Sequence, residues 1–128
     1  MLDTESRLLR HIVNIKMKMK NRSIKEIEHL LPKIKKHLQQ TYKRKLESVI
    51  LYGSFAKNKA TKDSDIDIAI VLKGKVNPSK EIDKVNDFIN NLEFEYDELI
   101  TILPVSSSEI KNSIWPLYKS LKREGIQF

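Results

Sequence analysis

Hydrophobic residues in the first third of the chain recur with the spacing of amphipathic helices. Within residues 4–20, four apolar side chains are separated by four, three and four positions, which predicts one helical stripe. These side chains are Leu8, Ile12, Ile15 and Met19. Ser23-Ile24-Lys25-Glu26 has the pattern of a capping box and predicts a second helix start. Because Pro32 interrupts the apolar stripe that follows, we expect this helix to break or bend near Leu31.

The middle of the chain alternates between short aliphatic runs and a longer helical pattern. The runs Leu46–Tyr52 and Ile66–Leu72 predict the first two β-strands. A helix is predicted over residues 78–92, because a proline suits its first position and apolar residues then recur every three or four positions. We expect a third strand over Tyr96–Leu103, which Pro104 stops.

The C-terminal part predicts two further helices. Ser107 or Ser108 can cap a short helix, and a last helix over residues 116–124 should end at Gly125. Two aromatic residues are expected to close the core from this side, namely Trp115 and Tyr118. The predicted fold class is α/β (α+β), with a small mixed sheet of three or more strands and helices packed on one face.

Length and composition fit one folded domain. At 128 residues, with 40% hydrophobic and 32% charged residues, the chain can bury a core without cross-links. We divide it into an N-terminal helical extension, residues 1–22, and a domain over residues 23–128. The absence of cysteine excludes disulfides and thiolate metal sites. No apolar run approaches the roughly 20 residues that span a bilayer, and the N-terminus lacks the features of a signal peptide, so we expect a cytoplasmic protein without membrane contact.

The net charge of +7 is unevenly distributed. Residues 1–62 contain sixteen Lys/Arg against five Asp/Glu, whereas residues 63–128 contain eight against twelve. Such asymmetry is typical either of nucleic-acid binding or of lysine-rich helix faces that water solvates. A nucleoside triphosphate would also be attracted by the positive field. Direct nucleic-acid binding is the least favoured of these interpretations.

Two short motifs indicate chemistry. Gly53-Ser54 follows the first predicted strand, and Asp65-Ile66-Asp67 comes ten residues later at the start of the second. Since side chains alternate along a strand, Asp65 and Asp67 project from the same face. Two carboxylates held this close repel each other, and a divalent cation is the usual reason for keeping both ionised. Gly53-Ser54 places backbone N–H groups at a predicted strand-to-helix turn, where a phosphate can bind.

A third carboxylate is available on the third predicted strand. Asp97 shares one face there with Leu99 and Thr101, while Glu98 points to the other face. Strand parity alone does not choose between the two acidic residues, because the register is unknown.

The motifs resemble those of the minimal nucleotidyltransferase (MNT) family, within the DNA polymerase beta-like superfamily. That family has Gly-Ser-x-Ala-Arg-Gly, a short spacer and Ser-Asp-x-Asp, which the segments 53–58 and 64–67 resemble. Residues 96–100 resemble the strand of the third carboxylate and select Asp97, and residues 116–126 resemble the end of MNT antitoxins. Lys57 replaces the usual Arg, and Asn58 the usual Gly, although Asn tolerates a left-handed backbone.

The resemblance implies roles for individual residues. Gly53 and Ser54 would hold the β- and γ-phosphates of ATP, and Lys57 would neutralise phosphate charge. Asp65 and Asp67 would bind Mg²⁺. Asp97 would either complete a second metal site or take the proton from the attacking hydroxyl; two Mg²⁺ ions are expected.

The function implied by the resemblance is transfer of AMP from ATP to a protein hydroxyl. The acceptor would be a tyrosine of a HEPN-domain ribonuclease toxin, which makes this chain the antitoxin. One alternative is a transferase for a small molecule of the aminoglycoside type, which a homodimer would have to enclose. Another is a non-catalytic module that masks its partner. The sequence leaves open the acceptor, the number of AMP units added and the oligomeric state.

Overall fold

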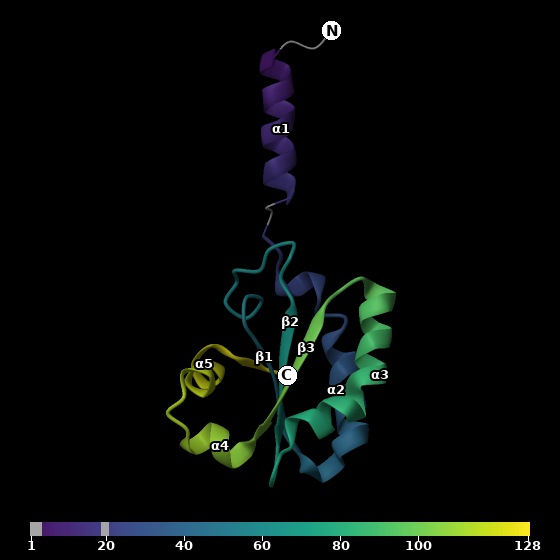
Figure 1. Ribbon diagram of the computed structural model, residues 1–128, viewed down its shortest axis with the longest axis vertical. Coiled ribbons are helices and arrows are strands. Elements are labelled where there is room, and N and C mark those ends of the chain that lie inside the picture. The colour runs from purple at the N-terminus through teal and green to yellow at the C-terminus, as the bar shows by residue number, and fades with distance from the viewer. Residues whose placement is uncertain (1–3, 19–20) are drawn as a thin grey trace.

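A four-stranded mixed sheet forms the centre of the protein, with helices on both of its faces (Figure 1). The structure is a computed structural model that describes residues 4–18 and 21–128, and for residues 14–18 the backbone alone. The helices are α1 (Thr4–Lys18), α2 (Leu31–Tyr42), α3 (Pro78–Tyr96), α4 (Ser107–Asn112) and α5 (Pro116–Glu124), with 3₁₀ turns η1 (Ile24–Glu26) and η2 (Lys43–Lys45). The strands are β1 (Leu46–Tyr52), β2 (Ile66–Leu72), β3 (Ile100–Ser106) and β4 (Ile126–Gln127).

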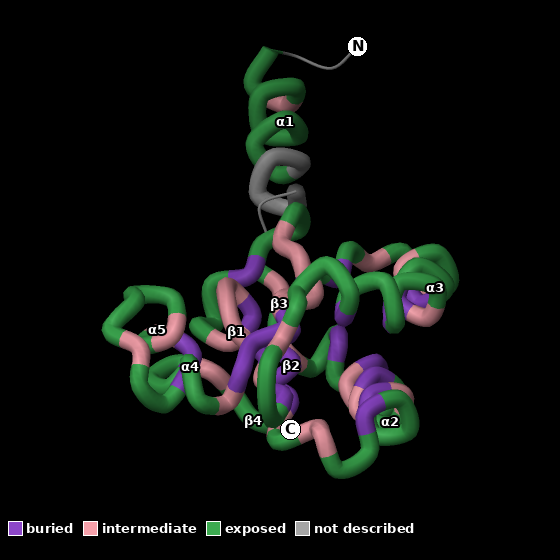
Figure 2. The backbone as a smooth tube through the Cα atoms, turned by 60° about the horizontal axis from the view of Figure 1, so that its bottom comes forward, coloured by how far each residue is buried: buried purple, intermediate pink, exposed green. Residues whose placement is uncertain are grey.

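Helix α1 stands away from the sheet and from the other helices (Figures 1 and 2). The apolar side chains of residues 4–13 remain exposed to solvent, with Leu8 57%, Leu9 59% and Val13 52% exposed. The last two residues of the predicted helix, 19–20, lie outside the described residues, and the division of the chain at residue 22 stays a prediction. None of the helices in the described part of the chain is long and apolar enough to cross a membrane.

The break predicted near Leu31 is confirmed, but the capping box before it is not. Helix α2 begins at Leu31 with Pro32 in its first turn. Ser23 precedes only the single turn η1, and its side chain makes no capping hydrogen bond. The carboxylate of Glu26 instead accepts a hydrogen bond from Nε of Arg22 at 2.7 Å. The Arg22 guanidinium therefore binds the Glu26 carboxylate, which a capping box would need.

The strand order is β3-β2-β1-β4, with β2 antiparallel to β1 and parallel to β3. The predicted bounds of β1 and β2 agree with the structure, because each is a run of aliphatic residues bounded by polar ones. A third strand is present, but its predicted bounds, Tyr96–Leu103, were wrong, because β3 spans Ile100–Ser106. Helix α3 continues through Tyr96, which follows the buried Leu92 by four positions and packs against the same core. Pro104 lies inside β3, which is possible because β3 is an edge strand whose outer side needs no N–H donor.

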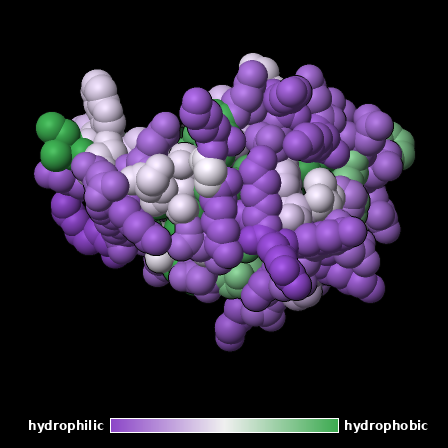
Figure 3. All heavy atoms as spheres, turned by 90° about the horizontal axis from the view of Figure 1, so that it is seen from below, coloured by the Kyte–Doolittle hydropathy of each residue, from purple (hydrophilic) through white to green (hydrophobic). Residues whose placement is uncertain are grey.

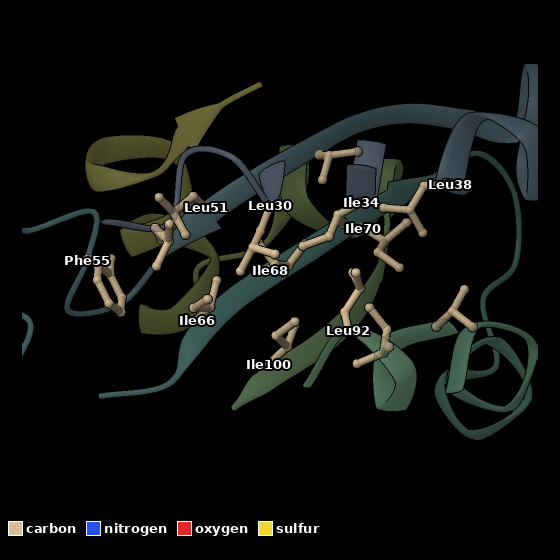
Figure 4. Close-up of a cluster of buried hydrophobic side chains, with 14 of the residues drawn as sticks. Leu30, Ile34, Leu38, Leu51, Phe55, Ile66, Ile68, Ile70, Leu92 and Ile100 are labelled. Carbon is tan, nitrogen blue, oxygen red and sulfur yellow. The ribbon is translucent and has the colours of Figure 1, made fainter. Parts of the chain in front are cut away.

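One face of the sheet packs against α2 and α3 and forms the main core (Figure 4). Side chains from β1, β2, β3 and both helices meet there, including Leu51, Ile66, Ile68, Ile70, Ile34, Leu38, Leu92 and Ile100. Phe55, from the segment after β1, is 1% exposed and lies at one end of this cluster. The helices predicted on one face are therefore α2 and α3.

The opposite face is only partly covered. Ala69 and Val71 of β2 pack with Ile110 of α4 and Leu121 of α5 in a second, smaller cluster. This is the face to which Asp67 belongs, since residues 67, 69 and 71 alternate with the main core positions. Helices α4 and α5 thus cover the far half of the carboxylate face, and the end near Asp67 stays more open.

Two expectations for the C-terminal region need correction. Trp115 is 69% exposed, so it does not close the core, whereas Tyr118 packs against the second cluster. Gly125 ends α5, but its φ of −68° is not left-handed. A Cβ there would overlap the Leu121 carbonyl and the Ile50 side chain, so glycine is required by close packing. Viewed from below, the surface is mostly hydrophilic, with a hydrophobic group at its left edge, the side of α4 and α5 (Figure 3).

Candidate active site

The Gly-Ser segment leaves β1 through a tight turn. Gly53 has a φ of +75°, which glycine adopts at little cost. Its carbonyl accepts from Lys57 N–H at 3.1 Å, and the Ser54 carbonyl accepts from Lys59 N–H at 2.8 Å. The segment is a turn over residues 54–58 rather than the start of an α-helix, which corrects the expected strand-to-helix transition. Phe55 fixes this turn, because its side chain is inserted into the main core.

Asn58 supports the same turn from its other end. Its φ is +58°, in the left-handed region that asparagine tolerates better than most residues. Asn58, where the family motif has Gly, therefore keeps the left-handed backbone that this turn needs.

Asp67 lies directly against Gly53. The antiparallel register of β1 and β2 pairs Tyr52 with Asp67, which brings the following glycine beside the carboxylate. A Cβ added at Gly53 would overlap Oδ2 of Asp67 and lie 3.1 Å from its Cγ. Asp65 comes immediately before β2 and is partly exposed, as Asp67 is. The turn and Asp67 therefore lie side by side, and the joint action of Gly53, Ser54, Asp65 and Asp67 as one site stays a prediction.

Across the sheet, the neighbour of Asp67 is a hydroxyl residue. The parallel register of β2 and β3 pairs Asp67 with Thr101, and Oγ1 of Thr101 donates to Oδ1 of Asp67 at 2.5 Å. On the other side, burial and the negative charge of Asp67 raise the pKa of the Tyr52 phenol, which a hydrogen bond with Thr101 partly offsets. Tyr52, Asp67 and Thr101 thus form a row of polar side chains across three strands.

The third predicted carboxylate lies elsewhere. Asp97 is the exposed residue that ends α3, in a left-handed conformation with φ 52° and ψ 47°. Glu98 is engaged by the Arg22 guanidinium, with Nη1 donating to Oε2 at 2.9 Å and Nη2 donating to Oε1. Among the residues that the structure describes, no three His, Cys, Asp or Glu side chains are grouped to hold a metal ion. The predicted convergence of Asp65, Asp67 and Asp97 is therefore not found.

Lys57 is near the site but is not free. Its Nζ lies 3.3 Å from Oε2 of Glu124 at the end of α5, and both side chains are 42% exposed. The bonds from Lys57 and from Ser120 lower the pKa of Glu124. This ion pair connects the Gly-Ser turn to α5.

Sequence reasoning missed Thr101 and Tyr52 as neighbours of Asp67. A signal for Thr101 was present, because Tyr96 continues the spacing of Val85, Ile89 and Leu92 and so extends the helix. With the strand start moved past Asp97, the first polar residue on β3 is Thr101. Glu124 gave no comparable signal, since its contact with Lys57 depends on how α5 packs.

Comparison with known proteins identifies the class. The family model described as "Polymerase beta, Nucleotidyltransferase" matches residues 32–123. A Methanocaldococcus jannaschii protein named "Putative protein adenylyltransferase MJ0126" is 37% identical over 93 residues, which cover 73% of this chain and 92% of that protein. The chain belongs to the polymerase beta nucleotidyltransferase family, and its activity is nucleotidyl transfer. The resemblance to minimal nucleotidyltransferases is thereby confirmed.

Solved structures share the fold. The structure of a "putative nucleotidyltransferase" from Sulfolobus solfataricus superimposes with a TM-score of 0.59 at 21% identity, covering 80% of this chain and 81% of that one. A structure described as "the toxin-antitoxin with AMP-PNP" superimposes with a TM-score of 0.54 at 21% identity, covering 75% of this chain and 69% of that one. The predicted polymerase beta-like fold is therefore confirmed.

Proposed function

We propose that this chain transfers AMP from ATP to a tyrosine hydroxyl of a HEPN-domain ribonuclease toxin and acts as its antitoxin. The observation that carries the proposal is the contact between Gly53 and Asp67, which sets a turn that can hold phosphates beside a carboxylate that can hold a metal ion. The named relative carries the description "Putative protein adenylyltransferase", and a fold neighbour is described as a toxin-antitoxin with AMP-PNP, an ATP analogue.

The residues present fit Mg²⁺ bound together with a nucleotide. Mg²⁺ prefers oxygen ligands, keeps several waters and is commonly held by one or two carboxylates plus substrate phosphates. Asp65 and Asp67 supply two carboxylates at an open end of the sheet face. When bound, the ion would neutralise charge on the triphosphate. The presence of two ions stays a prediction.

The chain's own residues would position the nucleotide for an in-line displacement. Gly53 and Ser54 would hold the β- and γ-phosphates through backbone N–H groups and the hydroxyl. The tyrosine oxygen attacks the α-phosphorus, the bond from that phosphorus to the bridging oxygen breaks, and pyrophosphate departs. The phenol proton passes to water. The partly open carboxylate face would let the toxin present its own acceptor.

The direct test is incubation with α-labelled ATP, Mg²⁺ and the HEPN protein encoded by a neighbouring gene. Mass spectrometry is expected to show AMP on one toxin tyrosine, and chelation of Mg²⁺ to abolish it. A toxin with that tyrosine changed to phenylalanine is the control. Failure to modify the toxin at any Mg²⁺ concentration, in the presence of bound ATP, contradicts the proposal.

Masking of a partner without catalysis is a second candidate, favoured by one surface. Ile114 and Trp115, between α4 and α5, are 82% and 69% exposed, and Leu117 is 43% exposed. Aromatic and aliphatic side chains of this kind are common at protein interfaces. Neutralisation of the toxin by a chain with both Asp65 and Asp67 changed to Asn would favour masking.

A further inference from the structure

Thr101 occupies the position on β3 that is nearest to Asp67. Parallel pairing places residues 67 and 101 side by side on one face of the sheet. The hydrogen bond of 2.5 Å from the Thr101 hydroxyl to Oδ1 joins residues 34 positions apart in sequence. A hydroxyl donates to an ionised carboxylate, and such bonds are stronger than those between neutral groups.

The second oxygen of Asp67 is restricted from the opposite side. Oδ2 faces Gly53 so closely that a Cβ at position 53 would overlap it. The two carboxylate oxygens of Asp67 are therefore constrained from different strands. The Thr101 side chain on β3 constrains Oδ1, and the Gly53 backbone after β1 constrains Oδ2. A carboxylate on a short side chain has only a few rotamers, and this arrangement selects one of them.

A carboxylate at position 101 would act differently from the hydroxyl. It would add a metal ligand, but without a metal it would repel Asp67. Threonine keeps Asp67 oriented whether or not a metal is present, because it donates a hydrogen bond and carries no charge. The described residues accordingly contain no group of three acidic side chains here.

We propose that Thr101 is a positioning residue that holds Asp67 in the orientation required for metal binding, in place of a third carboxylate. The inference rests on the proposed function, because it assigns the support of the same site. Residues that orient a metal ligand in this way typically change metal affinity or activity by about 10- to 100-fold when replaced.

The test compares Thr101→Val, which removes the hydroxyl and keeps the β-branched shape, with Thr101→Ser, which keeps the hydroxyl. Three quantities are measured: kcat and KM for AMP transfer, the affinity for Mn²⁺ in the presence of a non-hydrolysable ATP analogue, and the melting temperature. For Thr101→Val we expect kcat and Mn²⁺ affinity to fall about 10-fold or more, with KM for ATP within about 2-fold. For Thr101→Ser, kcat and Mn²⁺ affinity should both stay within about 3-fold of the values for the chain with Thr101.

Each outcome bears on a different proposal. Unchanged kcat and Mn²⁺ affinity in Thr101→Val overturn the positioning role, and so does equal impairment of Thr101→Ser. If no toxin is modified, the proposed function fails, but the Mn²⁺ titration still decides the role of Thr101. If the chain without substitutions binds neither Mn²⁺ nor the ATP analogue, both the proposed function and the role of Thr101 are overturned.

Discussion

The two sides of the candidate site differ in how far apart their residues lie in the sequence. The side formed by Gly53 and Asp67 belongs to consecutive antiparallel strands, joined by the connection over residues 53–65. The side formed by Asp67 and Thr101 joins residues 34 positions apart, with the whole of α3 between them. The first side follows from local spacing. The second depends on where a helix ends and a strand begins, and it is the side for which the expected residue, Asp97, was not found.

The largest loss of AMP transfer is expected when the negative charges at the start of β2 are removed. Asp65→Asn and Asp67→Asn keep the side-chain shape but remove a negative charge, and each is expected to lower AMP transfer at least about 100-fold. Transfer of labelled AMP measures the effect. Asp63→Asn, in the exposed turn just before, is the matched control and should retain full activity. If Asp67→Asn kept more than a tenth of the activity, the assignment of this carboxylate would be wrong.

The next largest effect should come from the contact on the β1 side. Gly53→Ala adds a Cβ against Oδ2 of Asp67 at a positive φ, so we expect AMP transfer to fall about 10- to 100-fold. The backbone cost alone is about 1 kcal/mol of unfolding free energy. Circular dichroism during denaturant unfolding and the transfer assay measure the two effects separately.

Gly74→Ala is the matched control for this substitution. Gly74 also has a positive φ, +80°, but nothing lies within 4 Å of an added Cβ. It should show a similar loss of unfolding free energy without loss of transfer. If Gly53→Ala and Gly74→Ala transferred AMP equally well, the contact of Gly53 with Asp67 would not contribute to AMP transfer.

The contrast between the two sides of the site also explains which elements could be predicted from the sequence. Strands β1 and β2 were predictable because aliphatic runs bounded by polar residues leave little freedom in their ends. The end of α3 was misplaced because Tyr96 has a high strand propensity. Its spacing from Leu92 continues the helical stripe, and packing against the core keeps it helical. Strand β4 has only two residues and forms because α5 returns the chain to β1. Local propensity carries no information about such contacts.

A smaller effect should distinguish Lys57 as a phosphate ligand from Lys57 as a surface ion pair. Lys57→Ala is expected to raise KM for ATP about 5-fold with little change in kcat, because the lost interaction stabilises the bound ground state and the transition state equally. Lys57→Arg should stay within about 2-fold. Glu124→Gln removes the competing partner 3.3 Å away and should lower KM slightly. An unchanged KM in Lys57→Ala would assign the lysine to the ion pair alone.

The smallest effect is expected at Asp97, which the sequence selected and the structure places at a helix end. Its left-handed conformation, φ 52°, suits glycine or asparagine. Asp97→Gly should therefore change the unfolding free energy by no more than about 1 kcal/mol, in the stabilising direction, because the strain of a Cβ at positive φ is removed. AMP transfer should be unchanged in Asp97→Gly and in Asp97→Asn, which removes only the charge. A 10-fold loss of transfer in both variants, with stability retained, would instead give Asp97 a direct role and require α3 to end earlier in the nucleotide-bound state.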